Sequence, residues 1–396
     1  MQESWDAVVV GAGPAGCAAA TWLAGRGAKV ALVETWAGQR RKVCGEFLGP
    51  AAWPVFRALG VDGAVRREAQ PIRSLALILP GERRIDAPVP ASGGDGPVSL
   101  SRQRLDQLLV ERAQAVGVQV FQGWQAGQVL VEDGHARGIM VRPAGSTEQQ
   151  PFRTDALIAA DGRSSGIVRQ TGSTRYRGPR LVAFKCHLGP NPPPADPEEL
   201  GMHSLPGGYI GRSTVEGSRQ NLCGVMPRQR LLAADGNIDQ AVRGWVGDHP
   251  LLARLLDEHA DHDGWTSASN ICIQRSRPRL PGVIYVGDAQ GTIEPLTGQG
   301  MSMALVGAWF ASEALAGGAR LAASEAAQAD FARRWDAWYR TRLHSAFWLG
   351  QCLRRPRVLA CLRALHGIHA NLSSAVLEGI YRRIPHPPDG IRPVTV

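Results

Sequence analysis

The first 46 residues constrain the fold more than any other part of the chain. An apolar run at residues 7–10 leads into Gly11-Ala-Gly13-Pro-Ala-Gly16, then a small-residue stretch and a second apolar run ending in Glu34. The order of strand, glycine-rich turn, helix and strand is that of a dinucleotide-binding β-α-β unit. In such a unit Gly11 makes the tight turn, Gly13 admits a pyrophosphate, and Gly16 lets the helix pack on the sheet. The sequence therefore predicts a Rossmann-like nucleotide site.

Two further features of this unit address the nucleotide. The helix that begins near Ala15 offers free N–H groups and the positive end of its dipole to phosphates. Glu34, at the end of the second strand, is the acid expected to accept a hydrogen bond from a ribose hydroxyl.

A second glycine-rich unit, at residues 283–301, indicates which nucleotide binds. A buried strand ends in Gly287-Asp288, and a loop holding Pro295, Gly298 and Gly300 leads into an apolar helix at Met301. This second unit is superfluous for NAD but suits FAD, whose ribityl chain and isoalloxazine need their own donors. Asp288 is expected to accept from a ribityl or ribose hydroxyl. The turn at residues 298–301 would aim helix N–H groups at the flavin edge that becomes negative on reduction.

Two more motifs lie between these units. Ala159-Ala-Asp161-Gly162 ends another strand, and Ser101-Arg102-Gln-Arg104-Leu105-Asp106 begins a helix. Together with the two glycine-rich units, they resemble the para-hydroxybenzoate hydroxylase-type flavoprotein superfamily over roughly residues 5–345. That superfamily holds aromatic monooxygenases, geranylgeranyl reductases and flavin-dependent halogenases. The resemblance implies that Arg102 and Asp161 belong to the FAD site.

The expected fold class is α/β, with a Rossmann-like FAD-binding domain interleaved with an antiparallel-sheet substrate domain, plus C-terminal helices. The FAD-binding domain would take residues 1–71, 98–170 and 276–345, and the substrate domain residues 72–97 and 171–275. Strand-like runs in the substrate domain lie at residues 75–79, 181–188, 207–211, 220–226 and 267–274, and an amphipathic helix pair at 238–258 breaks near His249-Pro250. Residues 346–396 form the C-terminal helical segment. In the superfamily, such a sheet covers the flavin and holds the substrate.

Composition favours a cytoplasmic enzyme without a nucleic-acid partner. The net charge is +9, but only three of the 44 basic residues are lysine, and the arginines are spread along the chain, which indicates coding bias more than a phosphate-binding face. Seven scattered cysteines without a C-x-x-C pair indicate reduced thiols, and neither a disulfide framework nor a metal site. No signal peptide or transmembrane run is visible.

The segment at residues 331–369 combines aromatic residues with many arginines, and helical spacing separates the two kinds onto different faces. A helical lid packed on the main body is one interpretation. Peripheral attachment to a lipid surface, or a channel for an apolar substrate, is the other.

The segment from Arg41 to Pro50 carries the first clue to the reaction. Its basic half, Arg41 and Lys42, would neutralise the adenosine or pyrophosphate end of FAD. Its Cys44-Gly45 resembles the Lys-x-Cys-Gly motif of geranylgeranyl reductases, in which the cysteine lies near the isoalloxazine. Gly45-Glu46 with Pro50 also resembles a turn of halogenases. Cys44 is thus either a residue near the flavin or a packing thiol.

Two other places bear on the reaction. The bulky Trp-x-Trp-x-Ile-Pro pattern of halogenases is absent, and of the Tyr-x-Trp-x-Phe-Pro pattern of isoprenoid reductases only Tyr209 remains. Glu294-Pro295 follows the Gly287-Asp288 strand end; a glutamate in a partly dry pocket would have a raised pKa and act as proton donor or base, or else only cap the loop. His187, His203 and Glu294 are the candidate bases for a phenolic substrate.

The sequence favours an FAD-dependent monooxygenase that hydroxylates an apolar aromatic or polyketide-like small molecule through a flavin C4a-hydroperoxide. Geranylgeranyl-reductase-like reduction of carbon–carbon double bonds, halogenation and a non-catalytic FAD-bearing scaffold are the alternatives. The candidate catalytic residues are Cys44, Tyr209 and Glu294. No second G-x-G-x-x-G is present, so electrons would come from transiently bound NAD(P)H or from a partner flavin reductase.

Overall fold

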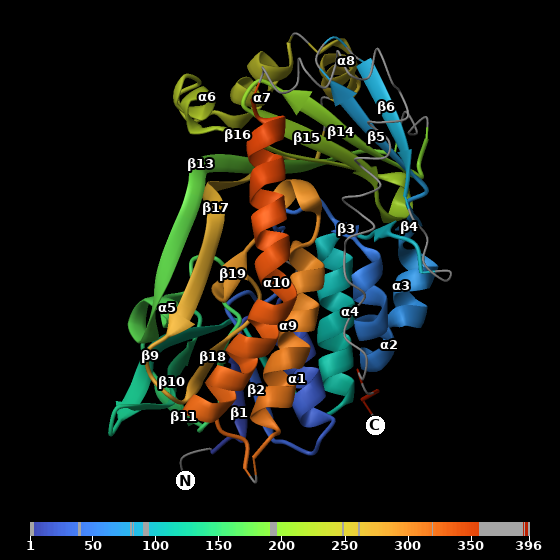
Figure 1. The fold of residues 1–396 in the computed structure, drawn as a ribbon. Helices are drawn as coiled ribbons and strands as arrows, with labels where there is room; N and C mark the ends of the chain where they lie inside the picture. The colour runs from blue at the N-terminus through green and yellow to red at the C-terminus, as the bar shows by residue number, and fades with distance from the viewer. Residues whose placement is uncertain are drawn as a thin grey trace.

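The computed structural model describes residues 4–38, 41–79, 81, 83–89, 95–190, 196–247, 249–259, 262–318, 320–355, 391 and 393–394. Figure 1 shows a helix-rich lower part beneath a broad upper sheet, with the long strands β13 (Gly172–Leu188) and β17 (Thr266–Pro278) running between the two. Helix α10 (Glu325–Leu353) extends alongside both parts. This is the expected α/β fold of two interleaved units.

A five-stranded parallel sheet forms the centre of the lower part. Its order is β18 (Val283–Tyr285), β12 (Leu157–Ala159), β1 (Ala7–Val10), β2 (Val30–Glu34) and β8 (Gln119–Gln122). Strand β1 is buried along its whole length, as strands covered on both faces are. One face carries helices α1 (Pro14–Ala24), α4 (Arg102–Ala115) and α9 (Gly300–Leu315). The other face packs on the three-stranded sheet β9 (Trp124–Glu132), β10 (His135–Pro143) and β11 (Gln150–Arg153).

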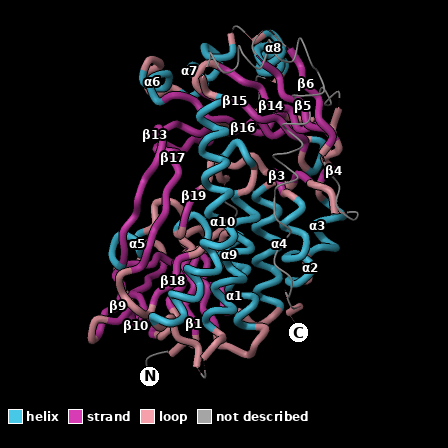
Figure 2. The backbone as a smooth tube through the Cα atoms, viewed as in Figure 1, coloured by secondary structure: helices cyan, strands magenta, loops and turns pink. Residues whose placement is uncertain are grey.

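The upper sheet has eight strands in the order β19-β17-β13-β16-β15-β14-β5-β6 (Figure 2). The strands not yet given are β19 (Gly291–Thr292), β16 (Gln220–Pro227), β15 (Gly208–Thr214), β14 (Glu199–Leu205), β5 (Ser74–Leu79) and β6 (Arg83–Pro88). All neighbours are antiparallel except β5 and β14, which run parallel. The expected antiparallel sheet is therefore present, with one parallel pair that the sequence did not indicate. The β5–β6 hairpin joins from a distant part of the chain, and local alternation does not encode its direction.

Side-chain alternation divides β13 between the two faces of the upper sheet. Val182, Phe184, Cys186 and Leu188 pack beneath α7 (Ile238–Val246) and α8 (Pro250–Glu258), the predicted helix pair. The alternate residues, Leu181, Ala183, Lys185 and His187, therefore face the lower part of the molecule. This inner face forms the roof of the site described below.

Shorter elements complete the described chain. They are β3 (Phe47–Leu48), η1 (Pro50–Ala52), α2 (Trp53–Leu59), α3 (Asp62–Glu68), β4 (Gln70–Pro71), β7 (Val98–Ser99), α5 (Gly166–Thr171), η2 (Glu216–Ser218), α6 (Arg228–Leu232), η3 (Gly287–Ala289) and η4 (Pro295–Thr297). Strands β3, β7 and β4 form a small sheet of their own.

Helix α10 packs on the main body through its aromatic face. Phe331, Trp335 and Tyr339, spaced four residues apart, are buried against the helical core, and the Tyr339 hydroxyl donates to the Met303 carbonyl at 3.0 Å. Residues 356–390 of the predicted C-terminal segment lie outside the described residues. Strand β17 and α10 continue across positions 275/276 and 345/346, where the sequence suggested boundaries. None of the helices described is both long enough and apolar enough to cross a membrane.

Candidate functional site

The three glycines of the first turn differ in how much room the protein leaves for a side chain. Gly11 has φ +104°, and a Cβ there would lie 2.4 Å from the Ala160 carbonyl oxygen. A Cβ on Gly16 would lie 1.8 Å from the carbonyl oxygen of Gly11, so only glycine allows α1 to approach β1. Gly13, in contrast, has room for a Cβ, which would make only ordinary contacts. A Cβ there would find only the Lys42 ammonium at 3.6 Å and the Arg102 guanidinium at 3.9 Å.

The start of α1 is prepared for an anion. Pro14 occupies its first turn next to Ala15, no side chain caps it, and its first turn has no acidic residue, so its N–H groups stay available. Glu34 is held at the end of β2, where its carboxylate accepts from the N–H of Ala12 at 2.8 Å and of Trp36 at 3.2 Å. This places an acid beside the glycine turn, as ribose recognition requires.

Arg102 is the buried cation in front of Gly13. Its guanidinium donates to both carboxylate oxygens of Asp106, at 3.0 and 2.8 Å, and Lys42 lies 3.5 Å from the same carboxylate. Burial lowers the pKa of Arg102, but Asp106 more than offsets this, so the net shift is upward and the charge is retained. The sequence did not assign Asp106 a role, although its spacing four residues after Arg102 on a helix could have indicated the pair.

The loops after β18 form the second end of the site. Asp288, Pro295 and Gly300 are exposed although their chain neighbours are largely buried, and nothing lies within 4 Å of a Cβ built on Gly300. Burial by the surrounding protein raises the pKa of Asp288, and Arg102 opposes that shift. Gly298 has φ +62°, and a Cβ there would press on Phe47 at 2.6 Å. With Gly13, the exposed residues Asp288, Pro295 and Gly300 line what we call the cofactor cleft.

Met301 and Asp161 were both expected at the FAD site, and the structure shows that their side chains have other contacts. The Met301 side chain is buried in the helical core, so it can serve a cofactor only through its backbone N–H, in the uncapped first turn of α9. Asp161 caps α5: one carboxylate oxygen accepts from the N–H of Gly166 at 2.8 Å. Its other oxygen is buried and has no hydrogen-bond partner among the described residues.

Arg41 lies elsewhere than the sequence suggested. Instead of facing Gly13, its guanidinium pairs with Asp263 at 2.5 Å and donates to the Gly264 carbonyl at 2.7 Å. Both partners precede β17, so Arg41 ties the segment before Cys44 to the upper sheet. This partner, 222 residues away in the chain, could not be recognised from local sequence.

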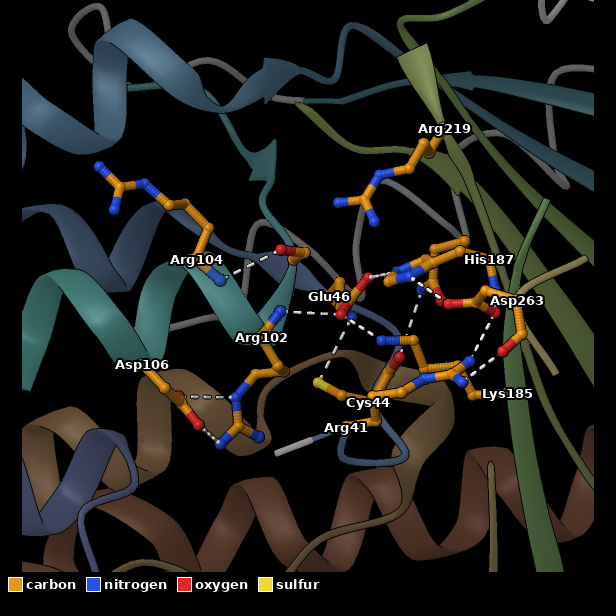
Figure 3. A network of polar contacts seen from close by, with 12 residues as sticks. Arg41, Cys44, Glu46, Arg102, Arg104, Asp106, Lys185, His187, Arg219 and Asp263 are labelled. Carbon is orange, nitrogen blue, oxygen red and sulfur yellow. Dashed lines mark hydrogen bonds and ion pairs between the residues drawn. The ribbon is translucent and has the colours of Figure 1, made fainter. Parts of the chain in front are cut away.

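A buried ionic network surrounds Glu46, as Figure 3 shows. Glu46 is fully buried, and its carboxylate contacts the Lys185 ammonium and accepts from the backbone N–H of Arg102 at 2.8 Å. Its other oxygen lies 2.7 Å from Nε2 of His187. His187 Nδ1 lies 3.3 Å from the Asp263 carboxylate, which also pairs with Arg41. We call Glu46, Lys185, His187, Asp263 and Arg41 the Glu46 cluster.

The Glu46 cluster holds its charges through pairing. Burial alone would raise the pKa of Glu46, but His187 and Lys185 bring it below its ordinary value. Burial lowers the pKa of His187, yet Asp263 and Glu46 raise it overall. Sequence reasoning named His187 only as a base and left Lys185 unassigned; that Lys185 is one of only three lysines was the available signal.

Cys44 lies between this cluster and the cofactor cleft. Its sulfur accepts from the Glu46 N–H at 3.3 Å, and its carbonyl accepts from the Asn221 side-chain amide at 3.2 Å. The thiol is partly buried, and burial raises its pKa although Arg102 opposes the shift. The next residue, Gly45, is exposed, with nothing within 4 Å of a built Cβ.

The other half of the sheet's inner face is apolar. Leu181, Ala183, Tyr209 and Val225 cluster there with Val43, Met202, Ile271 and Leu296. Tyr209 has a buried hydroxyl without a hydrogen-bond partner in the part of the chain that the structure describes. Burial, reinforced by nearby Glu294, raises its pKa well above the ordinary value. Two small cavities, each with room for about one water molecule, adjoin this loop: Glu294 and Pro295 line one, and Leu296 lines the other.

Glu294 is paired rather than free. Its carboxylate accepts from Arg354, the residue that follows the end of α10, at 2.8 Å, and both side chains are less than a tenth exposed. Burial raises the pKa of Glu294, and Arg354 opposes that shift. His203, the remaining candidate base, turns to His249 at the start of α8 with 3.3 Å between ring nitrogens. Burial lowers the pKa of His203 to about 3, so it is neutral under ordinary conditions.

The cofactor cleft fits FAD: the α1 end offers uncapped N–H groups and two cations, and the α9 end offers Asp288 and a glycine turn. A family model described as an FAD binding domain matches residues 4–328. The chain belongs to this FAD-binding family. Its relatives are named as reductases, monooxygenases and halogenases, and the protein is an FAD-dependent oxidoreductase.

Sequence relatives of this FAD-binding protein include reductases. A menaquinone reductase of Mycobacterium tuberculosis is 29% identical over 334 residues, covering 80% of this chain and 77% of that protein. Digeranylgeranylglycerophospholipid reductase 1 of Methanopyrus kandleri is 28% identical over 325 residues, covering 78% and 80%.

Solved structures share the fold. The myxobacterial chondrochloren halogenase CndH has a TM-score of 0.77 at 19% identity, covering 96% of this chain and 92% of that one. PqsL of Pseudomonas aeruginosa, described as a probable FAD-dependent monooxygenase, has a TM-score of 0.69 at 17% identity, covering 91% and 100%.

Proposed function

We propose that this protein reduces carbon–carbon double bonds in the isoprenoid chain of a lipid. The observation that carries the proposal is the position of the Cys44-Gly45 turn, between the cofactor cleft and an apolar sheet face that bears one buried phenol. The relatives with the highest identity given above are named for menaquinone and for a digeranylgeranyl lipid, and both molecules carry isoprenoid chains.

The chemistry requires a hydride at one carbon and a proton at the other. Reduced FAD supplies a hydride when it is bound. The proton must come from a group that is protonated at neutral pH and faces the apolar pocket. Burial raises the pKa of both Cys44 and Tyr209 and so keeps them protonated. Tyr209 belongs to the apolar cluster, and Cys44 directly follows Val43 of that cluster in the chain. Glu294 is held in an ion pair by Arg354, and both residues line one of the two cavities, so Glu294 contributes to the wall of the site rather than to proton transfer.

The apolar walls suit a hydrocarbon chain. Leu181, Met202 and Leu296 offer no strong hydrogen-bonding side-chain group to water, and they line the two small cavities, where a bound chain would separate the packed side chains. The same apolar lining also suits a second candidate, the hydroxylation of a small aromatic molecule that the sequence placed first.

One experiment separates the two reactions. The FAD-loaded protein is reduced with dithionite without oxygen and mixed with geranylgeraniol, and the product is analysed by mass spectrometry. Products that gain pairs of hydrogens support double-bond reduction. Unchanged geranylgeraniol under these conditions, together with oxygen-dependent addition of one oxygen atom to an aromatic test compound, would reject it in favour of hydroxylation.

Replacement of Cys44 gives an independent check. Cys44→Ala should retain FAD and lose most double-bond reduction, whereas a hydroxylase would stay largely active. The matched control is Cys186→Ala, a buried thiol on the outer face of β13. Equal reduction by both variants would remove Cys44 from the mechanism.

The source of electrons is part of the proposal. We expect NADH, NADPH or a partner flavin reductase to reduce the bound flavin, and anaerobic bleaching of flavin absorbance by each donor identifies which. The basic C-terminal segment, whose described part is the arginine-bearing helix α10, would bring the enzyme to a lipid surface, where its substrate resides. Co-sedimentation with phospholipid vesicles tests this contact.

A further inference from the structure

Burying the charges of the Glu46 cluster costs folding free energy, and the reduction of a double bond does not itself require a buried carboxylate at this place. Glu46 is fully buried, its two ion-pair partners Lys185 and His187 are nearly so, and buried ion pairs often gain little net stability. Glu46 also has φ +56°, an uncommon backbone conformation for a residue other than glycine. A strained backbone of this kind is often found at functional sites, and here it lies at the end of the Cys44-Gly45-Glu46 turn.

The geometry links Glu46 to Cys44 in two ways. Its N–H donates to the Cys44 sulfur at 3.3 Å, while its carboxylate points to the sheet and contacts Lys185 and His187 (Figure 3). The inner face of β13 is apolar at Leu181 and Ala183 and cationic at Lys185 and His187, so Cys44 stands where the two halves meet.

Charged groups approach Cys44 from every neighbouring element. Arg102 comes from α4 and Lys185 from β13, and both act to lower the pKa of the thiol. The thiol of Cys223 lies nearby on β16, and a negative charge on Cys44 would raise the pKa of Cys223. Among these groups, Glu46 supplies the negative charge that opposes the cations.

We propose that Glu46 is a positioning residue for Cys44: its carboxylate takes up the two cationic side chains that the sheet presents at this turn, and thereby shields the thiol from their charge. The use of a protonated thiol rests on the proposed reduction, whereas the charge balance itself exists without substrate. Without the carboxylate, the effect of Arg102 and Lys185 in favouring the thiolate would be unopposed, and protonated His187 would add to it. Cys44 would then change from an acid into a nucleophile.

The test measures the thiol directly, in the FAD-loaded protein and without substrate. Iodoacetamide alkylates thiolates, and the tryptic peptide spanning residues 43–57 contains Cys44 as its only cysteine, so mass spectrometry reports its modification alone. Alkylation rates are measured across a pH series. In Glu46→Gln the profile should move to lower pH, with alkylation at neutral pH about tenfold faster for a shift of one pKa unit.

The matched control is another buried carboxylate, which lies on the upper sheet. Glu199 on β14 is 3% exposed and binds Arg84 and Arg212, as Glu46 binds two cations. Glu199→Gln should leave the Cys44 profile at its wild-type position. An unchanged profile in folded, flavin-binding Glu46→Gln, or an equal shift in both variants, would overturn the proposal.

A second variant should shift the pH profile of Cys44 alkylation in the opposite direction. Lys185→Met removes a cation and should move the profile to higher pH and slow alkylation several-fold, and it carries the test if Glu46→Gln does not fold. An unchanged or faster rate in Lys185→Met would contradict the proposal. These readings also separate it from the proposed function: a shifted profile without reduction of geranylgeraniol leaves the charge balance intact and rejects only the reaction.

Discussion

At the scale of single residues, the glycines of the first turn are required for two reasons. Gly11 and Gly16 are required by the packing of the protein, and Gly13 by the ligand. Gly11 and Gly16 have no room for a side chain because backbone oxygens already fill that space. Gly13 has room, and the space beside it faces Lys42 and Arg102. Glycine at this position is therefore explained by what enters the cleft, because the protein itself leaves the position open.

This difference predicts the behaviour of Gly13→Val. The variant should fold with stability near that of the wild-type apoprotein but lose FAD, because the valine side chain would project in front of the α1 N-terminus. Flavin absorbance of the purified protein measures retention. Gly63→Ala in α3, a substitution that meets only the Arg67 side chain, is the control and should stay yellow. Normal flavin content in Gly13→Val would reject the assignment of the pyrophosphate site.

His187 predicts a pH dependence of stability. Its pKa is higher in the folded protein than the ordinary 6.5, so its protonation stabilises the fold fully below about pH 6.5. That contribution is lost as pH rises through the folded-state value. The wild-type free energy of unfolding should therefore decline from neutral into alkaline pH, and His187→Gln should decline less.

Urea unfolding from about pH 6 to about pH 9 measures both slopes. His344→Gln, which changes an exposed histidine on α10, should keep the wild-type slope. Identical slopes in wild type and His187→Gln would show that Asp263 and Glu46 do not stabilise the charged ring.

Residue roles that depend on local backbone were predictable from the sequence. The glycine turn and the Arg102 helix start follow from short spacings, since a tight turn or a cap involves neighbours in the chain. The pairs Lys185–Glu46 and Arg354–Glu294 join residues 139 and 60 positions apart. Nothing in the local pattern marks ordinary charged residues as partners over such distances, so these pairs emerge only from the fold.

At the scale of elements, α10 reaches the site because one of its residues is small. Gly350 faces Glu294, and a Cβ there would come within 2.5 Å of the carboxylate. The absence of a side chain lets the end of the helix approach closely enough for Arg354 to bind Glu294. The approach of the helix and the ion pair therefore depend on each other.

Gly350→Ala should force α10 away from the loop. We expect a loss of about 1–3 kcal/mol in unfolding free energy from overpacking, together with weaker substrate binding. Gly307→Ala in α9 is the control, since its Cβ would make an ordinary contact with Trp335 at 3.8 Å. Chemical unfolding compares the two. Equal stability of the variants would mean that the helix end adjusts freely.

Elements with a clear period were predicted well, and their partners were not. The alternation along residues 181–188 and the break at His249-Pro250 indicated the strand and the helix pair that the structure contains. The parallel pairing of β5 with β14 was missed, because the inward and outward pattern of a strand is the same in both directions.

At the scale of the whole molecule, the two domains share strands. Strands β13 and β17 pair beside α5 in the lower part and again within the upper sheet. We therefore expect FAD to stabilise the entire chain in one cooperative transition. Free FAD at 100 times its Kd should add about 2.7 kcal/mol, read as an upward shift of a single Tm.

Two controls accompany this measurement. Gly13→Val should show no shift with FAD, and circular dichroism should report the same Tm as tryptophan fluorescence. A second transition that FAD does not move would show that the substrate sheet unfolds independently of the cofactor domain.

The long β13–β17 ribbon has one weak point. Its register shifts between Arg177 and Leu181 and again before Ala183, next to Gly178 with φ +93°. A paired ribbon resists sliding, so any flexing concentrates at this knee. Gly178 and Leu181 also line the cavity beside Glu294, together with Phe347 of α10. We therefore expect the width of this cavity to depend on the bend of the ribbon at the register shift. A tilt of one domain against the other would then change the thickness of the chain that the site can accept.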